Sequence, residues 1–125
     1  PMAKDVTEIY RNYAHDLKLG DGKADVEFSL SPDNFKAVRS SDESMLLCMN
    51  DSPKIVISAS GMLQGGRVLH HLRTKLPGEQ NGVLFVGYQG AGTKGKLLKN
   101  GLRSIRIHHM NIQVEAEIFS IDSLS

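Results

Sequence analysis

Cysteine is nearly missing from the sequence: its 125 residues include one cysteine, Cys48, and no tryptophan. A disulfide within the chain is therefore impossible, and a lone cysteine is typical of proteins in a reducing compartment. Cys48 stands in the apolar run Met45–Met49, which predicts a buried thiol. We therefore expect a cytoplasmic protein that relies on a hydrophobic core.

The sequence also lacks an excess of either charge and lacks long apolar runs. Its 15 lysines and arginines face 14 aspartates and glutamates, so any site for a polyanion must be local. No apolar run approaches the roughly 20 residues of a membrane-spanning helix, and no signal peptide is visible. We expect no membrane partner, and the length suits one domain over residues 1–125.

The most informative stretch is Lys54–Leu76, in which an apolar run, a small-residue loop and an amphipathic segment follow one another. The β-branched residues of Ile55–Ala59 predict a buried strand. Serines and glycines fill Ser58–Gly66, and leucines at helical spacing predict a helix that opens at Arg67. This order makes half of a βαβ unit, whose loop is where open α/β sheets bind ligands.

The same order of elements returns once. Val83–Val86 predicts a strand, Gly87–Gly95 a glycine-rich loop, and Lys96–Asn100 a helix. Repeated strand–loop–helix units favour a mainly parallel sheet with helices on both faces. The predicted fold class is α/β, a three-layer α/β/α arrangement in which Ile55–Ala59 and Val83–Val86 are neighbouring parallel strands.

Three further elements precede these units. Apolar residues at helical spacing predict an amphipathic helix over Met2–Leu17. Phe35–Val38 has the composition of a short strand, and the capping box of Ser41–Ser44 predicts a short helix over Met45–Met49.

The C-terminal part follows another pattern. From Ser104 on, apolar and polar residues alternate, which is typical of strands that bury one face. A turn is expected near His109–Asn111. The sequence therefore predicts a C-terminal antiparallel hairpin at one edge of the sheet, continued by Phe119–Ile121.

Two nucleotide-binding motifs are nearly present in Gly90–Lys96, and neither fits. The pattern G-x-G-x-x-G is there, but three residues separate strand and first glycine, and the acidic partner Glu115 lies in the predicted hairpin. A P-loop needs a hydroxyl after Lys96, where Leu97 stands. A dinucleotide-binding enzyme or an NTPase is therefore disfavoured.

Histidine patterns add neither a catalytic site nor a metal site. His70 and His71 are adjacent on the predicted helix and point about 100° apart, so they do not chelate one ion together. His108 and His109 are adjacent at the predicted turn, without the spacing of zinc ligands. No Ser–His–Asp set is identifiable. The sequence therefore predicts no catalytic residue and no metal ligand.

Two glycine-rich loops with basic neighbours remain: Arg67 follows the first, and Lys94 and Lys96 accompany the second. If their strands are parallel, both loops lie at one edge of the sheet, where backbone N–H groups and cations can hold phosphate. The alternative is that the glycines serve tight turns and the packing of helix on sheet.

Three segments together closely resemble one family. They are Ile55–Leu72 (IVISASGMLQGGRVLHHL), Val83–Gly95 (VLFVGYQGAGTKG) and Ile105–Ser125. In this order they are similar to the β-CASP family, RNA-cutting proteins with a metallo-β-lactamase fold. The resemblance is closest to prokaryotic members described as RNA-processing exonucleases or as RNA-specificity-factor-like.

The resemblance also bears on the two ends. Pro1–Ala3 matches the residues after the acidic group of the family's first motif, and Ser123–Ser125 precedes the position of the second-motif histidine. The expectation is most of a β-CASP cassette, trimmed at both ends. His108 follows the family's Ile-His-Gly pattern with His109 in place of glycine, and is not expected to be the catalytic histidine.

The resemblance implies RNA as substrate, and a metallo-β-lactamase domain of the same parent chain with two zinc ions that activate water for attack on a phosphodiester. This chain would supply a phosphate-gripping wall, with no cofactor of its own. The alternative is a stand-alone nucleotide- or RNA-binding module without hydrolytic activity. The residues expected to contact RNA phosphates are Ser60, Gly61, Gly65, Gly66, Arg67, Thr93, Lys96 and Ser125.

Overall fold

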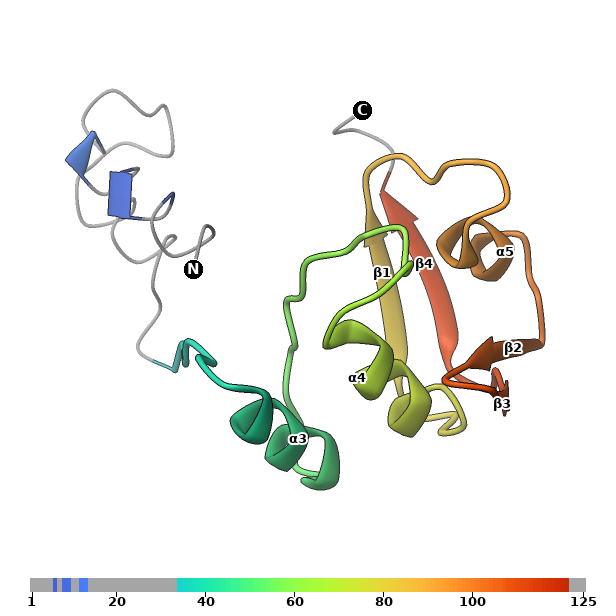
Figure 1. Cartoon of the computed structure of the whole chain (residues 1–125), viewed down its shortest axis with the longest axis horizontal. Coiled ribbons are helices and arrows are strands. Elements are labelled where there is room, and N and C mark those ends of the chain that lie inside the picture. Colours follow the sequence, from blue (N-terminus) through green and yellow to red (C-terminus); the bar gives the residue numbers. More distant parts are fainter. Residues whose placement is uncertain (1–5, 7, 10–11, 14–33, 122–125) are drawn as a thin grey trace. The chain divides into compact units, whose positions relative to one another are not determined.

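The computed structural model describes residues 6, 8, 9, 12, 13 and 34–121 (Figure 1). The chain divides into two compact units, Pro1–Ser40 and Ser41–Ser125. Of the predicted helix Met2–Leu17, the described residues Val6, Glu8, Ile9 and Asn12 are helical. Tyr13 is a turn residue, and its N–H donates to the carbonyl oxygen of Ile9 at 3.1 Å. The other residues of that prediction lie outside the described ones.

The predicted short strand Phe35–Val38 is wrong. These residues form neither helix nor strand, and the Phe35 side chain is exposed. A strand exists only with a hydrogen-bonding neighbour, and no described strand pairs with this segment. Suitable composition alone is therefore not sufficient here.

Two helices of the second unit pack on each other. Helix α3, Ser41–Met49, confirms the prediction from the capping box; Asp42 and Glu43 lie in its first turn, where the helix dipole favours negative charge. Helix α4, Val68–Lys75, follows Arg67 directly, as the leucine spacing predicts.

The main sheet consists of two parallel strands, β1 (Gly82–Val86) and β4 (Glu117–Ile121). A parallel pair is as predicted, but the partner of β1 is not. The predicted strand Ile55–Ala59 is wrong: it forms no strand, and Ile55 and Ile57 are 92% and 88% exposed. Apolar composition favours burial, but pairing is decided by which segment reaches the edge of β1 in register, and that segment is β4.

The antiparallel hairpin is confirmed, but its predicted place at an edge of the main sheet is wrong, because among the described strands β2 and β3 pair only with each other, in a separate two-stranded sheet. After helix α5 (Lys94–Lys99), strand β2 (Ser104–Ile107) pairs with β3 (Met110–Gln113). The two residues between the strands, His108 and His109, form the turn. Alternation of apolar and polar residues buries Ile105, Ile107 and Ile112 on one side of the hairpin.

The predicted continuation of the hairpin into Phe119–Ile121 is wrong, because these residues belong to β4 and pair with β1. The change of direction is anchored on helix α4. The N–H groups of Glu115 and Ala116 both donate to the carbonyl oxygen of Leu76, at 2.9 Å each. These two hydrogen bonds therefore fix the position at which the chain passes from the hairpin to β4.

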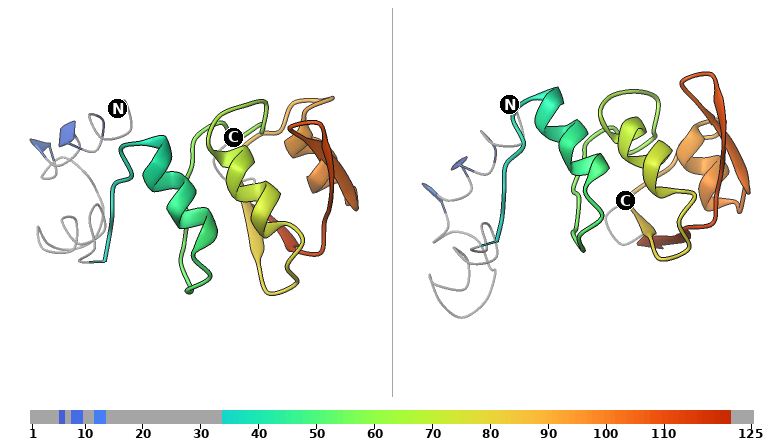
Figure 2. Two further views of the ribbon diagram at one scale, coloured as in Figure 1. Left: turned by 60° about the horizontal axis from the view of Figure 1, so that its bottom comes forward. Right: turned by 90° about the horizontal axis from the view of Figure 1, so that it is seen from below.

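The hydrophobic core lies between the helices and one face of the sheet. Figure 2 shows α4 and α5 on the same side of β1 and β4. Phe85 points into the core, whereas its neighbours Leu84 and Val86 are each 53% exposed on the other face. The described part is therefore a mixed α/β structure with helices on one face. Its core consists of Leu63, Leu69, Leu72, Leu76, Phe85, Leu98, Ile105, Ile107, Ile112, Val114 and Ala116.

Candidate phosphate-binding loops

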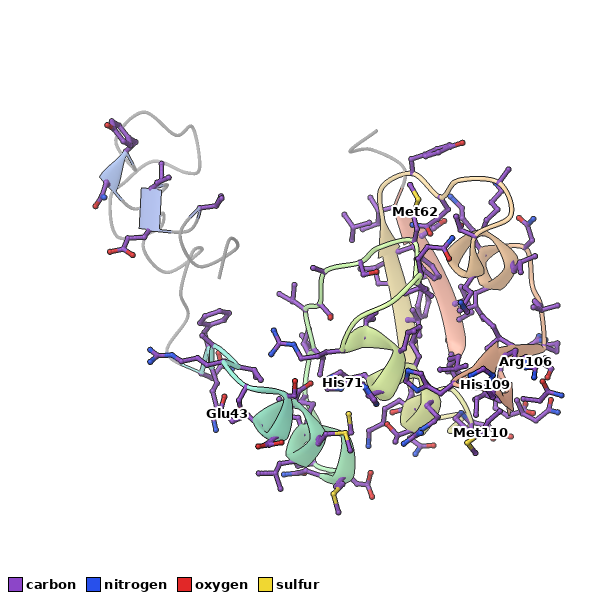
Figure 3. All side chains as sticks on the ribbon, viewed as in Figure 1. Glu43, Met62, His71, Arg106, His109 and Met110 are labelled. Carbon is purple, nitrogen blue, oxygen red and sulfur yellow. The ribbon has the colours of Figure 1, made fainter. Side chains whose placement is uncertain are left out.

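The structure brings the two predicted loops into contact. We call Ser58–Gly66 the first glycine loop and Gly87–Thr93 the second glycine loop. The N–H of Gly95, just past the second loop, donates to the carbonyl oxygen of Met62 in the first, at 3.3 Å. Figure 3 shows Met62 at the end of the β1–β4 sheet from which the second loop leaves β1. The predicted meeting of the loops therefore occurs, although no strand precedes the first loop.

The first glycine loop closes on itself at the start of α4. Ser60 has a φ of 66°, and its carbonyl oxygen accepts the N–H of Leu63 at 2.8 Å. A Cβ on Gly66, whose φ is 84°, would lie 4.0 Å from the Cβ of Ser60. Ser60 and Gly66 are therefore neighbours, directly before the exposed Arg67.

Gly61 and Gly65 stand in open space. A Cβ added to either would meet no heavy atom within 4 Å, and neither has a positive φ. Neither the packing of helix on sheet nor a left-handed turn therefore requires glycine at these two positions. Open backbone of this kind can be approached closely by a ligand.

Thr93 of the second loop is engaged as the N-cap of α5. Its buried hydroxyl donates to the carbonyl oxygen of Gly90 at 2.7 Å and accepts the N–H of Lys96 at 3.2 Å. A side-chain oxygen at this position satisfies a helix N–H group that has no partner within the helix. Thr93 therefore holds the loop in shape, and the partly buried Lys96 side chain stands in the first helical turn.

Sequence reasoning missed the pair of Gln89 and Gly95. The Gln89 side chain is 4% exposed, and its Oε1 has no hydrogen-bond partner among the described residues. A Cβ on Gly95 would overlap this amide oxygen and lie 3.2 Å from the carbonyl oxygen of Gly61. The available signal was a polar residue three positions after the end of a strand, between Tyr88 and Gly90.

A structural role for Arg67 would pair it with a carboxylate such as Glu43 or Asp51. Asp51 forms an ion pair with Lys75 in which Nζ and Oδ1 are 2.7 Å apart. The Lys75 hydrogen bond and charge lower the pKa of Asp51 below its usual value. The remaining site residue, Ser125, lies outside the described part of the chain.

The predicted burial of Cys48 is confirmed, and the thiol contacts a histidine. Within the described residues it is a free thiol, and its Sγ lies 3.3 Å from Nδ1 of His71. The other ring nitrogen, Nε2, lies 2.9 Å from Oγ of Ser44. Burial, and then the charges of nearby cations including His70, lower the pKa of His71. Both ring nitrogens are engaged between α3 and α4 (Figure 3), so this histidine has a structural role.

Across the described ranges, no three His, Cys, Asp or Glu side chains form a group that could hold a metal ion. In the same ranges, no helix has both the length and the apolar character that crossing a membrane requires.

Comparison with known proteins gives a consistent result. A family model, the Beta-Casp domain, matches residues 1–98. Transcription termination factor FttA of Methanocaldococcus jannaschii is 33% identical over 96 residues, which are 73% of this chain and 15% of that protein. The RNase J-like protein of the same organism is 33% identical over 118 residues, 93% of this chain and 26% of its own length. Ribonuclease TTHA0252 of Thermus thermophilus is 32% identical over 94 residues, 75% of this chain and 22% of its own length. The chain thus spans about a quarter or less of these relatives.

Proposed function

Because the chain belongs to the Beta-Casp family, we propose that it is the RNA-clamping part of a zinc-dependent ribonuclease of RNA processing. Two of its relatives are named as ribonucleases or as RNase J-like. The observation that carries the proposal is the contact between the two glycine loops through Gly95 and Met62. It unites two sets of backbone N–H groups and basic side chains into one surface.

Arg67 is the principal phosphate-binding residue in this proposal. It stands at the N-terminal end of α4, beside Ser60 and Gly66. A phosphate there would meet the positive end of the helix dipole and a guanidinium, which binds phosphate oxygens in a bidentate manner. The open backbone at Gly61 and Gly65 would let the RNA strand approach.

Lys96 adds a second cation from the other loop, and Thr93 keeps that cation in place by capping α5. Since the two loops are joined by a backbone hydrogen bond, Arg67 and Lys96 act on one RNA strand. The chain's own residues thus bind and orient the phosphodiester. Ser125 is proposed to contact the same strand.

The zinc ions belong elsewhere in this proposal. The described residues offer no group of three ligands that fits a metal ion, so the two zinc ions are assigned to a metallo-β-lactamase domain of the parent chain. When bound there, they would supply an activated water. The lone, buried thiol of Cys48 agrees with a parent enzyme in the reducing cytoplasm.

We also propose that the sheet is the middle layer of a three-layer α/β/α arrangement. The support is its second face, where Leu84 lies beside Phe119 and Val86 beside Ile121, all four at least 44% exposed. Apolar residues at alternate positions on a sheet are typical of a face that is covered. A structure of the parent protein that leaves this face in water would contradict the arrangement.

The proposal is tested with the variant Arg67→Lys. We expect affinity for single-stranded RNA to fall about tenfold or more, because a bidentate charge-assisted contact is worth roughly 1.5–3 kcal/mol and lysine does not reproduce it. Fluorescence anisotropy with a labelled oligouridylate measures the affinity, and a thermal melt of the same sample measures stability. The matched control is Arg106→Lys on β2, whose affinity should stay within about twofold of the wild-type value.

Three results would count against the proposal. Lost stability with intact RNA affinity would make Arg67 a residue that holds the fold. Equal losses in Arg67→Lys and Arg106→Lys would mean unspecific attraction. In the encoding gene, absence of an upstream His-x-His-x-Asp-His block would favour the alternative, a stand-alone binding module without hydrolysis.

A further inference from the structure

Two histidines that the proposed function does not use have their rings in contact. The ring centroids of His70, on α4, and His108, in the β2–β3 turn, are 4.6 Å apart, with ring planes at 41°. Arg73 lies one helical turn after His70, on the same side of α4. The contact therefore joins a helix and a hairpin that are distant in sequence.

One nitrogen of this pair has no partner. Nδ1 of His70 is buried and makes no hydrogen bond with any described residue. A buried polar atom in this state is costly, and such atoms are rare in folded proteins. When it carries a proton, this nitrogen is a donor without an acceptor among the described residues.

The β2–β3 turn that contains His108 has a sequence that is unfavourable for its backbone conformation. His108 and His109 both have positive φ values, 46° and 65°. Two-residue hairpin turns of this geometry favour Asn-Gly, because side chains other than Asn and Asp disfavour positive φ. Strained backbone is concentrated at functional sites, where the surroundings hold it in place. Here it exposes two imidazoles beside α4.

Basic side chains from three elements act on His108. Partial desolvation lowers its pKa, and so do the charges of His70 and Arg73 on α4, His109 in the turn, and Lys94 at the start of α5. Since these groups repel one another, an anion between them would be stabilised. A metal ion would be repelled by Arg73 and Lys94, and the described part holds no three-ligand group of metal-binding type.

We propose that His70, Arg73, Lys94, His108 and His109, called the histidine cluster, bind a phosphate group of the RNA, and that they bind it more tightly as the pH falls. This inference rests on the proposed function and extends it. Lys94 follows Thr93 directly, so the histidine cluster continues the surface of the second glycine loop toward the hairpin. The RNA strand would thus pass from Arg67 over α5 to the β2–β3 turn.

The pH dependence follows from linkage. A bound phosphate favours the imidazolium form, so it raises the pKa of His108, and protonation of His108 strengthens phosphate binding by the same factor. The affinity should therefore rise as the pH falls through the pKa of His108 in the complex, and it should level off below the pKa of His108 in the free protein, which lies below its ordinary value.

The first experiment uses the complete chain and inorganic phosphate, without RNA. NMR titration of the imidazole signals should show that phosphate raises the apparent pKa of His108 and shifts the signals of His70. The signals of His71, which is engaged by Ser44 and Cys48, should not move. Unchanged signals of His70 and His108 at saturating phosphate would overturn the proposal.

The second experiment measures oligouridylate binding at pH 5.5 and pH 8 for the wild type, His108→Asn and the matched control Arg106→Gln. Asparagine keeps the tolerance for positive φ and removes the imidazole. His108→Asn should lose about tenfold in affinity at pH 5.5 and less than about twofold at pH 8. Arg106→Gln should lose little at either pH.

The outcomes separate the two proposals. RNA binding that depends on Arg67 but is equal in His108→Asn and Arg106→Gln would overturn the histidine cluster and leave the proposed function intact. No RNA binding by the wild type at either pH would overturn the proposed function, whatever inorganic phosphate does to the imidazole signals.

Discussion

Gly95 is the residue at which the two loops and α5 meet, and it illustrates how local context reverses a general rule. In a helix, Gly→Ala ordinarily stabilises by up to about 1 kcal/mol. Here a Cβ would overlap the Gln89 amide oxygen and press on the Gly61 carbonyl oxygen at 3.2 Å. We expect Gly95→Ala to destabilise the protein by about 1–3 kcal/mol, the usual cost of overpacking, as measured by urea unfolding.

The matched control for this prediction is Gly90→Ala in the second glycine loop. There the nearest atoms to an added Cβ, from Met62 and Thr93, lie at 3.5 Å, an ordinary contact distance. Gly90→Ala should therefore change the unfolding free energy by less than about 0.5 kcal/mol. Equal effects of the two substitutions would refute the steric account.

His109 offers a second prediction at the scale of one residue. Its φ of 65° is unfavourable for a side chain, with a cost of roughly 1–2 kcal/mol that glycine avoids. Because glycine also loses more entropy on folding, His109→Gly should stabilise by a net amount of about 0.5–1 kcal/mol in urea unfolding.

Asn111→Gly, on strand β3, is the control for this effect. It lacks the positive φ that glycine relieves, so glycine there should lower stability. A destabilising His109→Gly would show that the turn is not strained. A stabilising Asn111→Gly would show that a gain from glycine in this hairpin does not depend on positive φ.

At the scale of elements, the contact between α3 and α4 depends on a neutral imidazole. Burial lowers the pKa of His71, between Ser44 and Cys48. The unfolded chain therefore binds a proton more readily than the folded protein. The free energy of unfolding should be greatest above about pH 6.5 and should decrease as the pH falls below that value.

Urea unfolding at several pH values between 5 and 8, for the wild type and His71→Gln, measures this effect. The variant should lose part of the pH dependence. The remaining part is expected because the pKa of His108 is lowered as well. If the free energy of unfolding has the same pH dependence in the two proteins, the α3–α4 contact does not depend on a neutral His71.

The elements also show what the sequence can predict. Helices α3 and α4 follow from caps and from leucine spacing, signals that lie within one segment. The strand predicted at Ile55–Ala59 fails and β4 takes its place, because pairing depends on segments far apart in the chain. The composition of a segment indicates that it can form a strand, but it does not determine which other strand it will pair with.

The candidate site divides in the same way. The meeting of the loops around Met62 was predicted on the condition that parallel strands precede both loops. The loops do meet, although no strand precedes the first one. The buried amide of Gln89 was not, since its burial arises from the approach of Gly95 and Gly61 in three dimensions. Likewise, no sequence spacing links His70 to His108.

At the scale of the whole molecule, a nearly neutral protein is proposed to bind a polyanion. The formal net charge is +1, so binding should depend on a few local contacts, among them Arg67 and Lys96. With about three phosphate contacts to single-stranded RNA, the logarithm of the binding constant should fall with the logarithm of salt concentration with a slope of about −2.

Anisotropy titrations between low and physiological salt measure this slope. Replacing Arg67 by Gln should make it shallower by about 0.7, the contribution of one phosphate contact. A slope near zero in the wild type would mean that RNA binding does not involve phosphate contacts. An unchanged slope in Arg67→Gln would remove this residue from the set.

The pairing of β1 with β4 has a consequence for how the protein is made. Gly82 pairs with Glu117, 35 residues later, whereas the hairpin pairs residues separated by a two-residue turn. Hairpins close within microseconds, and long-range parallel pairing is slower because a large loop must be closed first. During synthesis on the ribosome, the β1 segment therefore has no hydrogen-bonding partner strand until β4 has emerged. In that interval the nascent chain is most exposed to aggregation.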